Sequence, residues 1–134
     1  MAVTYFNRQL FENIVDGAKE AVKDSTNIVH KEVRRLVLDT PKTGKIRTHK
    51  ITGEPHQASA PGETYASETG NALANTRKYV ENNGMTGKVT SEAEYAYILE
   101  VDMNRPALRP ALSNKQKEIS KKFEKKIKDA VNKS

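Results

Sequence analysis

The segment from Tyr95 to Leu112 (YAYILEVDMNRPALRPAL) constrains the fold more than any other stretch of this sequence. It contains two Arg-Pro dipeptides that are four residues apart. A residue that precedes proline is disfavoured in the α region, so we expect Arg105 and Arg109 to be extended or in turns. Pro110 is still compatible with the first turn of a helix, where a backbone N–H has no intrahelical acceptor. The segment therefore predicts a short apolar stretch, a rigid elbow and the start of a C-terminal helix.

Apolar residues between Phe6 and Leu38 recur every three or four positions, which predicts one long amphipathic helix. Poor helix formers at residues 24–27 leave a bend there as an alternative to an uninterrupted helix. We expect the helix to end before Thr40, and we expect charged residues such as Glu32 to face solvent. Because the apolar stripe lies on one side only, a sheet or another helix must cover it.

Residues 40–70 are rich in Pro, Gly, Thr and Ser, and this composition predicts a long extended loop. Within it, Lys45–Thr52 (KIRTHKIT) alternates enough for a short strand. We favour an arm that becomes ordered against a neighbouring subunit, and a surface loop is the alternative. The expected interface residues are Lys45, Ile46, Arg47, His49, Ile51, His56 and Tyr65.

The dipeptide Asn83-Gly84 predicts a β-hairpin, because both residues tolerate positive φ angles. Residues 71–81 contain the β-formers of the first strand, and Thr86–Ser91 supplies the return strand. A second helix is expected from Pro110 to Val131. The predicted fold class is therefore α+β, in which the N-terminal and C-terminal helices pack on a small antiparallel sheet within a single domain that spans residues 1–134.

The net charge of +6 is concentrated at the C-terminal end of the chain. Residues 105–134 contain ten Lys and Arg against three Asp and Glu, a net charge of +7. This pattern is typical of a solvated helix face, but it also fits non-specific binding to nucleic-acid phosphates. The candidate contacts for that alternative are Lys121, Lys122, Lys125 and Lys126.

No motif in the sequence predicts catalysis or a cofactor. The absence of cysteine excludes disulfides, thiolate metal sites and cysteine nucleophiles. His49 and His56 match no short-spaced metal motif, and Ser59, near His56 and Glu63, lacks a nucleophile elbow. We therefore predict a chain that is not an enzyme and that has no metal and no cofactor. Without an apolar leader or a long apolar window, we also expect no signal peptide and no membrane span.

Five short motifs occur in order along the chain: TPKTG (40–44), ASAPGE (58–63), ETG (68–70), YAYILE (95–100) and RPALRPAL (105–112). Together with the long N-terminal helix, they resemble the head–tail joining, neck or tail-completion family of long-tailed bacteriophages, which includes the minor tail protein Z type. The resemblance assigns signature positions to Tyr95, Leu99, Glu100, Arg105, Pro106, Arg109 and Pro110.

This resemblance implies a structural virion protein that is made in the host bacterial cytoplasm and joins the head connector to the tail tube. It implies a homo-oligomeric ring, for which we favour six copies. The implied partners are connector or stopper proteins, tail terminator proteins and tail tube proteins. Contact with DNA is not required by this role, and no membrane is involved.

Overall fold

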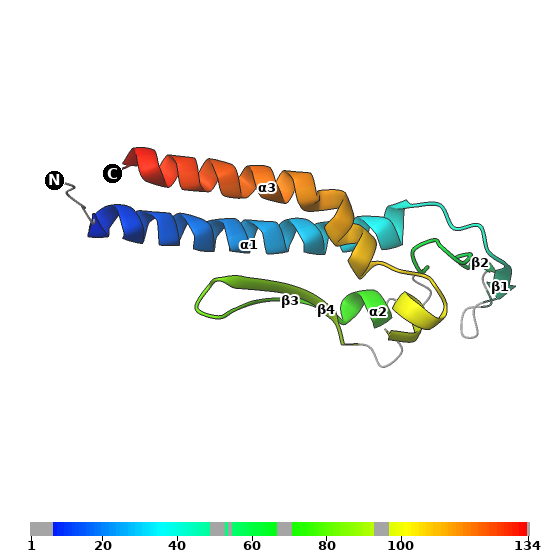
Figure 1. Cartoon of the computed structure of the whole chain (residues 1–134). Helices are drawn as coiled ribbons and strands as arrows, with labels where there is room; N and C mark the ends of the chain where they lie inside the picture. The colour runs from blue at the N-terminus through cyan, green and yellow to red at the C-terminus, as the bar shows by residue number, and fades with distance from the viewer. Residues whose placement is uncertain (1–6, 49–52, 54, 67–70, 93–96, 134) are drawn as a thin grey trace.

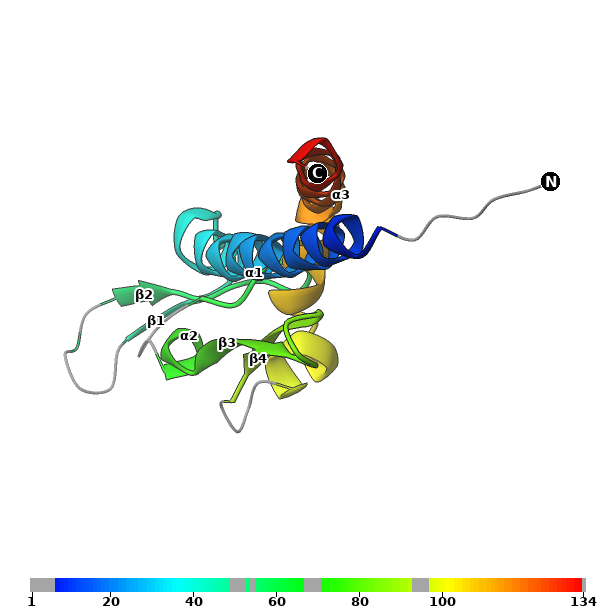
Figure 2. The same ribbon diagram turned by 90° about the vertical axis from the view of Figure 1, so that its left-hand side faces the viewer.

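The computed structural model describes residues 7–48, 53, 55–66, 71–92 and 97–133. Helices α1 (Arg8–Asp39) and α3 (Leu108–Lys133) run side by side in opposite directions (Figure 1). Strands β3 (Thr76–Glu81) and β4 (Thr86–Ser91) form an antiparallel hairpin that also packs on α1. Helix α1 lies between α3 and the hairpin in both views (Figures 1 and 2). The predicted α+β architecture is thus confirmed.

Helix α1 is continuous, without a break at residues 24–27. It begins after Asn7, whose side-chain Oδ1 accepts a hydrogen bond of 3.0 Å from the backbone N–H of Leu10. Residues with small side chains occur where neighbouring elements approach most closely. A Cβ atom on Gly17 would lie 2.9 Å from a backbone oxygen of α3. Ser25 and Thr26 are both buried, and Thr26 lies directly against Gly87 of the hairpin. These weak helix formers therefore make close packing possible, while tertiary contacts keep the helix intact.

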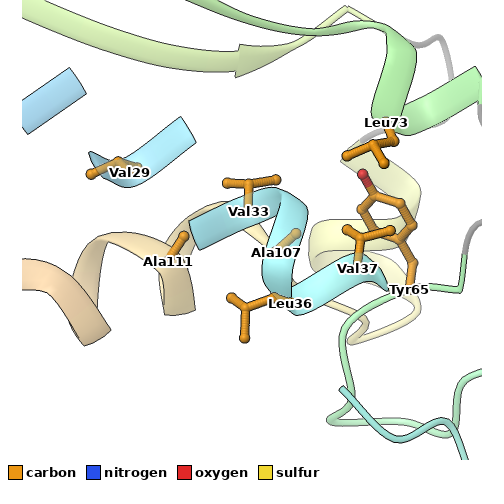
Figure 3. Packing of buried hydrophobic residues seen from close by; sticks show 8 residues of the cluster. All are labelled: Val29, Val33, Leu36, Val37, Tyr65, Leu73, Ala107 and Ala111. Carbon is orange, nitrogen blue, oxygen red and sulfur yellow. The ribbon is translucent and has the colours of Figure 1, made fainter. Parts of the chain in front are cut away.

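The hydrophobic core lies at the C-terminal half of α1 (Figure 3). Val33 and Val37 are 1% and 3% exposed, and Tyr65 lies beside Val37 and Leu73. Where α3 begins, the fully buried side chains are the small ones of Ala107 and Ala111, and Leu108 and Ile119 of α3 pack against the cluster from its edge. The buried cluster consists of Val29, Val33, Leu36, Val37, Tyr65, Leu73, Ala107 and Ala111.

Glu32 is buried, which contradicts the prediction that it faces solvent. Its carboxylate accepts hydrogen bonds from Arg35 Nε at 2.5 Å and from Asn114 Nδ2 on α3 at 3.2 Å. The bonds from Arg35 lower the pKa of Glu32 despite the opposing effect of burial. Periodicity could not predict this position, because a buried charge needs bonded partners, and one of the partners of Glu32 comes from α3.

The region from 40 to 70 is more structured than the loop that we predicted. It contains the antiparallel strands β1 (Ile46–Thr48) and β2 (Pro55–Gln57). Ser59, Thr64 and Tyr65 are buried against the body of the fold. Composition indicated flexibility here, whereas burial of one aromatic ring and the hydrogen bonds described below order the chain.

The hairpin follows a short helix, α2 (Asn71–Ala74), so β3 begins later than the predicted β-forming stretch. Asn82, Asn83 and Gly84 all have positive φ, of 54°, 56° and 87°, as the Asn-Gly signal predicted. Gly87 lies directly against α1, where an added Cβ would be 1.9 Å from Thr26 Oγ1. The hairpin is therefore seated on α1 at a point where only glycine fits.

Candidate functional site

Four of the five sequence motifs converge where α1 ends and α3 begins. We call this region the motif junction; it comprises the described residues of 40–44, 58–63 and 97–111. The third motif, at 68–70, and the first two residues of YAYILE, Tyr95 and Ala96, lie outside the described residues. The junction joins segments that are far apart in sequence, and each motif has its own structural task there.

The first motif, TPKTG, ends α1. Lys42 Nζ donates hydrogen bonds of 2.9 Å to the backbone oxygens of Leu36 and Thr40. A cation at this end of a helix satisfies carbonyl groups that have no intrahelical partner and interacts favourably with the helix dipole. Burial lowers the pKa of Lys42. The lysine therefore serves as a partly buried helix cap.

Glu63 ties the second motif to the first. Its carboxylate accepts hydrogen bonds from the backbone N–H groups of Ala60 at 2.7 Å and Thr43 at 2.9 Å, and from Thr43 Oγ1 at 2.8 Å. The bonds from Ala60 and Thr43 lower the pKa of Glu63. Gly44 is required beside it, because a Cβ there would lie 2.4 Å from the backbone oxygen of Ser59.

Arg105 ties the second motif to the elbow. Its Nε and Nη2 atoms donate to the backbone oxygen of Ser59 at 3.2 and 3.1 Å. The backbone N–H of Gly62 donates to the oxygen of Asn104 at 2.6 Å. Arg105 lies in irregular structure, as its position before a proline predicted.

Glu100 caps α3 from outside the helix. Its Oε1 accepts from the backbone N–H groups of Ala107 and Leu108 at 2.8 and 3.0 Å, and its Oε2 pairs with Arg109 Nε at 3.1 Å. Burial raises the pKa of Glu100, but the bonds from Ala107, Leu108 and Arg109 outweigh it, so the pKa is lowered. An anion at a helix N-terminus complements the dipole. Glu100 therefore binds both the N-terminal backbone of α3 and an arginine of its first turn.

The prediction that Arg109 is extended or in a turn is wrong, because α3 begins at Leu108 and Pro110 is its third residue. The first N–H groups of a helix have no intrahelical acceptor, so proline is tolerated at this position. Leu99 is half-buried and packs on the core, and Pro106 is also half-buried. Tyr95 lies outside the described residues.

The expected interface residues divide between the surface and the core. Lys45 and Ile46 are exposed, and the Ile46 side chain is 69% exposed. Arg47 lies in β1 and His56 in β2, whereas His49 and Ile51 lie outside the described residues. Tyr65 is only 8% exposed and belongs to the core, so its side chain is not part of the chain's free surface.

The four lysines proposed as nucleic-acid contacts do not share one face of α3. Lys126 points to α1, where Nζ lies 3.0 Å from Glu20 Oε2 and 3.9 Å from Asp24 Oδ2. It therefore relieves the repulsion between these two acids, which are one helical turn apart. Lys121 and Lys125 are exposed and Lys122 is half-buried.

No group of three metal-ligating side chains occurs among the residues that the structure describes. His30 Nε2 lies 3.4 Å from the backbone oxygen of Thr76, and His49 falls outside the described ranges. Ser59 is 4% exposed, and Glu63 is occupied by the bonds to Ala60 and Thr43. In the set of Ser59, His56 and Glu63, the carboxylate is thus used for hydrogen bonds to backbone N–H groups.

An open apolar groove of about 530 Å³ runs along α1 between β4 and α3. Sequence reasoning missed it, because its walls come from three separate elements. Leu112 and Met85 on its walls are 50% and 45% exposed. The lining includes Val22 and Val29 on α1, Gly87 and Val89 on β4, and Leu112 and Phe123 on α3.

Comparison with protein-family models finds no match, and neither the curated proteins nor the solved structures include a match to this chain. Within the described part of the chain, no helix is long and apolar enough to cross a membrane.

Proposed function

We propose that this chain is a structural virion protein of the phage neck, where it joins the head connector to the tail tube as one subunit of a ring. The observation that carries the proposal is the motif junction. The motifs that resemble the neck and tail-completion family make a single hydrogen-bonded network. Within it, Lys42, Glu63, Glu100 and Arg105 all bind backbone atoms. These charged groups hold a scaffold together, which is the task expected of an assembly subunit.

The surface of the chain supports the same role. Ile46 on β1 is 69% exposed, and Leu112 and Met85 beside the apolar groove are 50% and 45% exposed. Exposed apolar side chains that gather in this way are often covered by a partner protein. A closed ring would give each subunit two neighbours to cover them, and six copies would match a six-fold tail.

Deletion of the gene from its phage tests the proposal. The expected result, by electron microscopy of lysates, is an accumulation of finished heads and finished tails that remain separate. Addition of the purified protein to such a lysate should restore joined particles. Intact virions in the absence of the protein would overturn the proposal, as would an antibody label on the capsid or tail tip instead of the neck.

Non-specific nucleic-acid binding is a second candidate function, and one feature of α3 favours it. Lys117, Lys121, Lys125 and Lys128 are exposed and spaced by four, four and three residues, so they lie on one helix face. None of the four is within ion-pair distance of an acidic side chain in the described part of the chain.

The double variant Lys121→Gln/Lys125→Gln tests this second function. It should weaken binding to unrelated duplexes and reduce the slope of log affinity against log salt by about two. Lys126→Gln is the matched control, because Lys126 is bound to Glu20 and contributes little to the exposed row. Equal losses in both variants, or no measurable duplex binding by the natural chain, would exclude this function.

A further inference from the structure

We propose that strand β1 of one copy adds to the free edge of β4 in the next copy, so that neighbouring chains share a four-stranded sheet. This inference rests on the proposed function in one respect, since it names the contact between subunits of the ring. It follows from the edges of the two hairpins, the groove beside β4 and the exposed side chain of Ile46.

The free edge of β4 borders the groove. The N–H of Glu92 donates to the oxygen of Asn75, and hydrogen-bonded pairs alternate along an antiparallel ladder. The backbone groups of Gly87, Val89 and Ser91 therefore point away from β3. Gly87 and Val89 line the groove, and β4 pairs only with β3 among the described residues. The groove thus has a row of unpaired backbone donors and acceptors along one side.

Strand β1 has a free edge of the same kind. The N–H of Ala58 donates to the oxygen of Lys45, so by the same alternation the backbone groups of Ile46 and Thr48 point away from β2. Both hairpins have only two strands, and a two-stranded sheet is marginally stable by itself. Joining β1 to β4 would give each hairpin more partners.

The other edge of each hairpin is protected against such pairing. Pro55 lies opposite Thr48 in β2, where its nitrogen points outward and has no hydrogen to donate. On β3, the exposed Lys78 reaches Asn27 of α1 with Nζ 2.6 Å from Oδ1, and a lysine on an edge strand is a common protection against pairing. The unprotected edges are therefore those of β1 and β4.

The groove provides a place for the side chain that β1 carries. Ile46 is 69% exposed, the largest exposure among the chain's described large apolar residues. An added strand at the edge of β4 would direct alternate side chains into the groove, where Met85 and Leu112 offer exposed apolar surface. Addition of a strand beside such a pocket is an established mode of peptide recognition.

The strand that occupies the groove comes from a second copy of this chain, because β1 and β4 of one copy lie too far apart to pair with each other. Strands β1 and β2 project beyond the end of α1, whereas the tip of the β3–β4 hairpin points toward the end where the termini lie (Figure 1). The contact joins two different surfaces, so it repeats from subunit to subunit and gives a ring where the rotation between neighbours closes.

Two variants of the full-length chain test this contact. Ile46→Asp places a charge on the added strand, and Leu112→Lys places one in the groove; each site is at least half exposed, so the monomer should still fold. Each variant should weaken self-association at least ~100-fold in sedimentation velocity. Leu38→Asp is the control, because Leu38 is 55% exposed and belongs neither to β1 nor to the lining of the groove. It should assemble like the natural chain.

An equal mixture of the two variants gives the sharpest result. The Ile46→Asp copy retains its groove and the Leu112→Lys copy retains its strand, so the mixture should form heterodimers that grow no further. A concentration of about 100 μM is well above the dissociation constant expected of such an interface. A natural chain that stays monomeric at this concentration would overturn the inference. A mixture that stays monomeric would also overturn it, as would an Ile46→Asp variant that assembles normally.

The proposed function and this contact can fail separately. If Ile46→Asp still assembles and still joins heads to tails, strand addition is wrong and the neck role stands. If strand addition occurs but phage without the gene make intact virions, the neck role is wrong and the contact stands.

Discussion

Replacement of Glu100 by glutamine should lower the free energy of unfolding by about 1–2 kcal/mol. Glutamine keeps an acceptor for the N–H groups of Ala107 and Leu108 but removes the charge. Hydrogen bonds to a charged group contribute about 1 kcal/mol more than neutral ones, and the pair with Arg109 adds less, because the Arg109 side chain is 65% exposed. Glu100→Ala also removes the acceptor and should cost about 3 kcal/mol.

Urea unfolding at pH 7, followed by circular dichroism, measures these differences. Glu118→Gln is the matched control on the same helix, because Glu118 pairs with Lys115 on the surface and is 54% exposed. Its loss should be below about 0.5 kcal/mol. A Glu100→Gln variant as stable as the natural chain, or a control that loses as much, would refute the role of Glu100 as the cap of α3.

The pH dependence of the same comparison follows from the lowered pKa of Glu100. A carboxyl group whose pKa is lower in the folded than in the unfolded chain stabilises the fold when the pH is above its ordinary pKa, here 4.5. This stabilisation is lost as the pH falls through the lowered pKa. The difference between the natural chain and Glu100→Gln should therefore be constant at neutral pH and disappear in acid. A difference that stays constant as the pH falls well below the ordinary value of 4.5 would contradict this linkage.

Three further substitutions probe contacts that position the hairpin and the motif junction. Gly87→Ala should cost about 2–3 kcal/mol in urea unfolding, because its Cβ would meet Thr26, and Thr26→Ala in the same chain should recover part of the loss. Tyr65→Ala should cost about 3–5 kcal/mol by opening a cavity in the core; a loss below 1 kcal/mol would place the ring outside it. Arg105→Ala should speed hydrogen exchange at the Gly62 amide about tenfold, while exchange in the β3–β4 hairpin stays unchanged.

The two long helices and the β3–β4 hairpin could be predicted from the sequence because their signals are local. Apolar spacing from residue 6 to 38 and from 110 to 131 depends only on which side chains share a helix face. The Asn83-Gly84 turn depends only on which residues tolerate positive φ. The helix boundaries differ from the prediction by at most two residues where the structure describes them, since helix ends depend on capping.

Only the tertiary structure determines which polar side chains pair with one another and which of them are buried. Glu32 is bound by Arg35 of its own helix and, across the helix pair, by Asn114 of α3, and Arg109 is helical because Glu100 binds the first N–H groups of α3. Such pairings join residues that are distant in sequence, and a side chain's own chemistry does not specify which distant partner the fold brings to it. The free edges of β1 and β4 are likewise a property of the assembled fold, because a strand's unpaired side is defined only once its partner strand is in place.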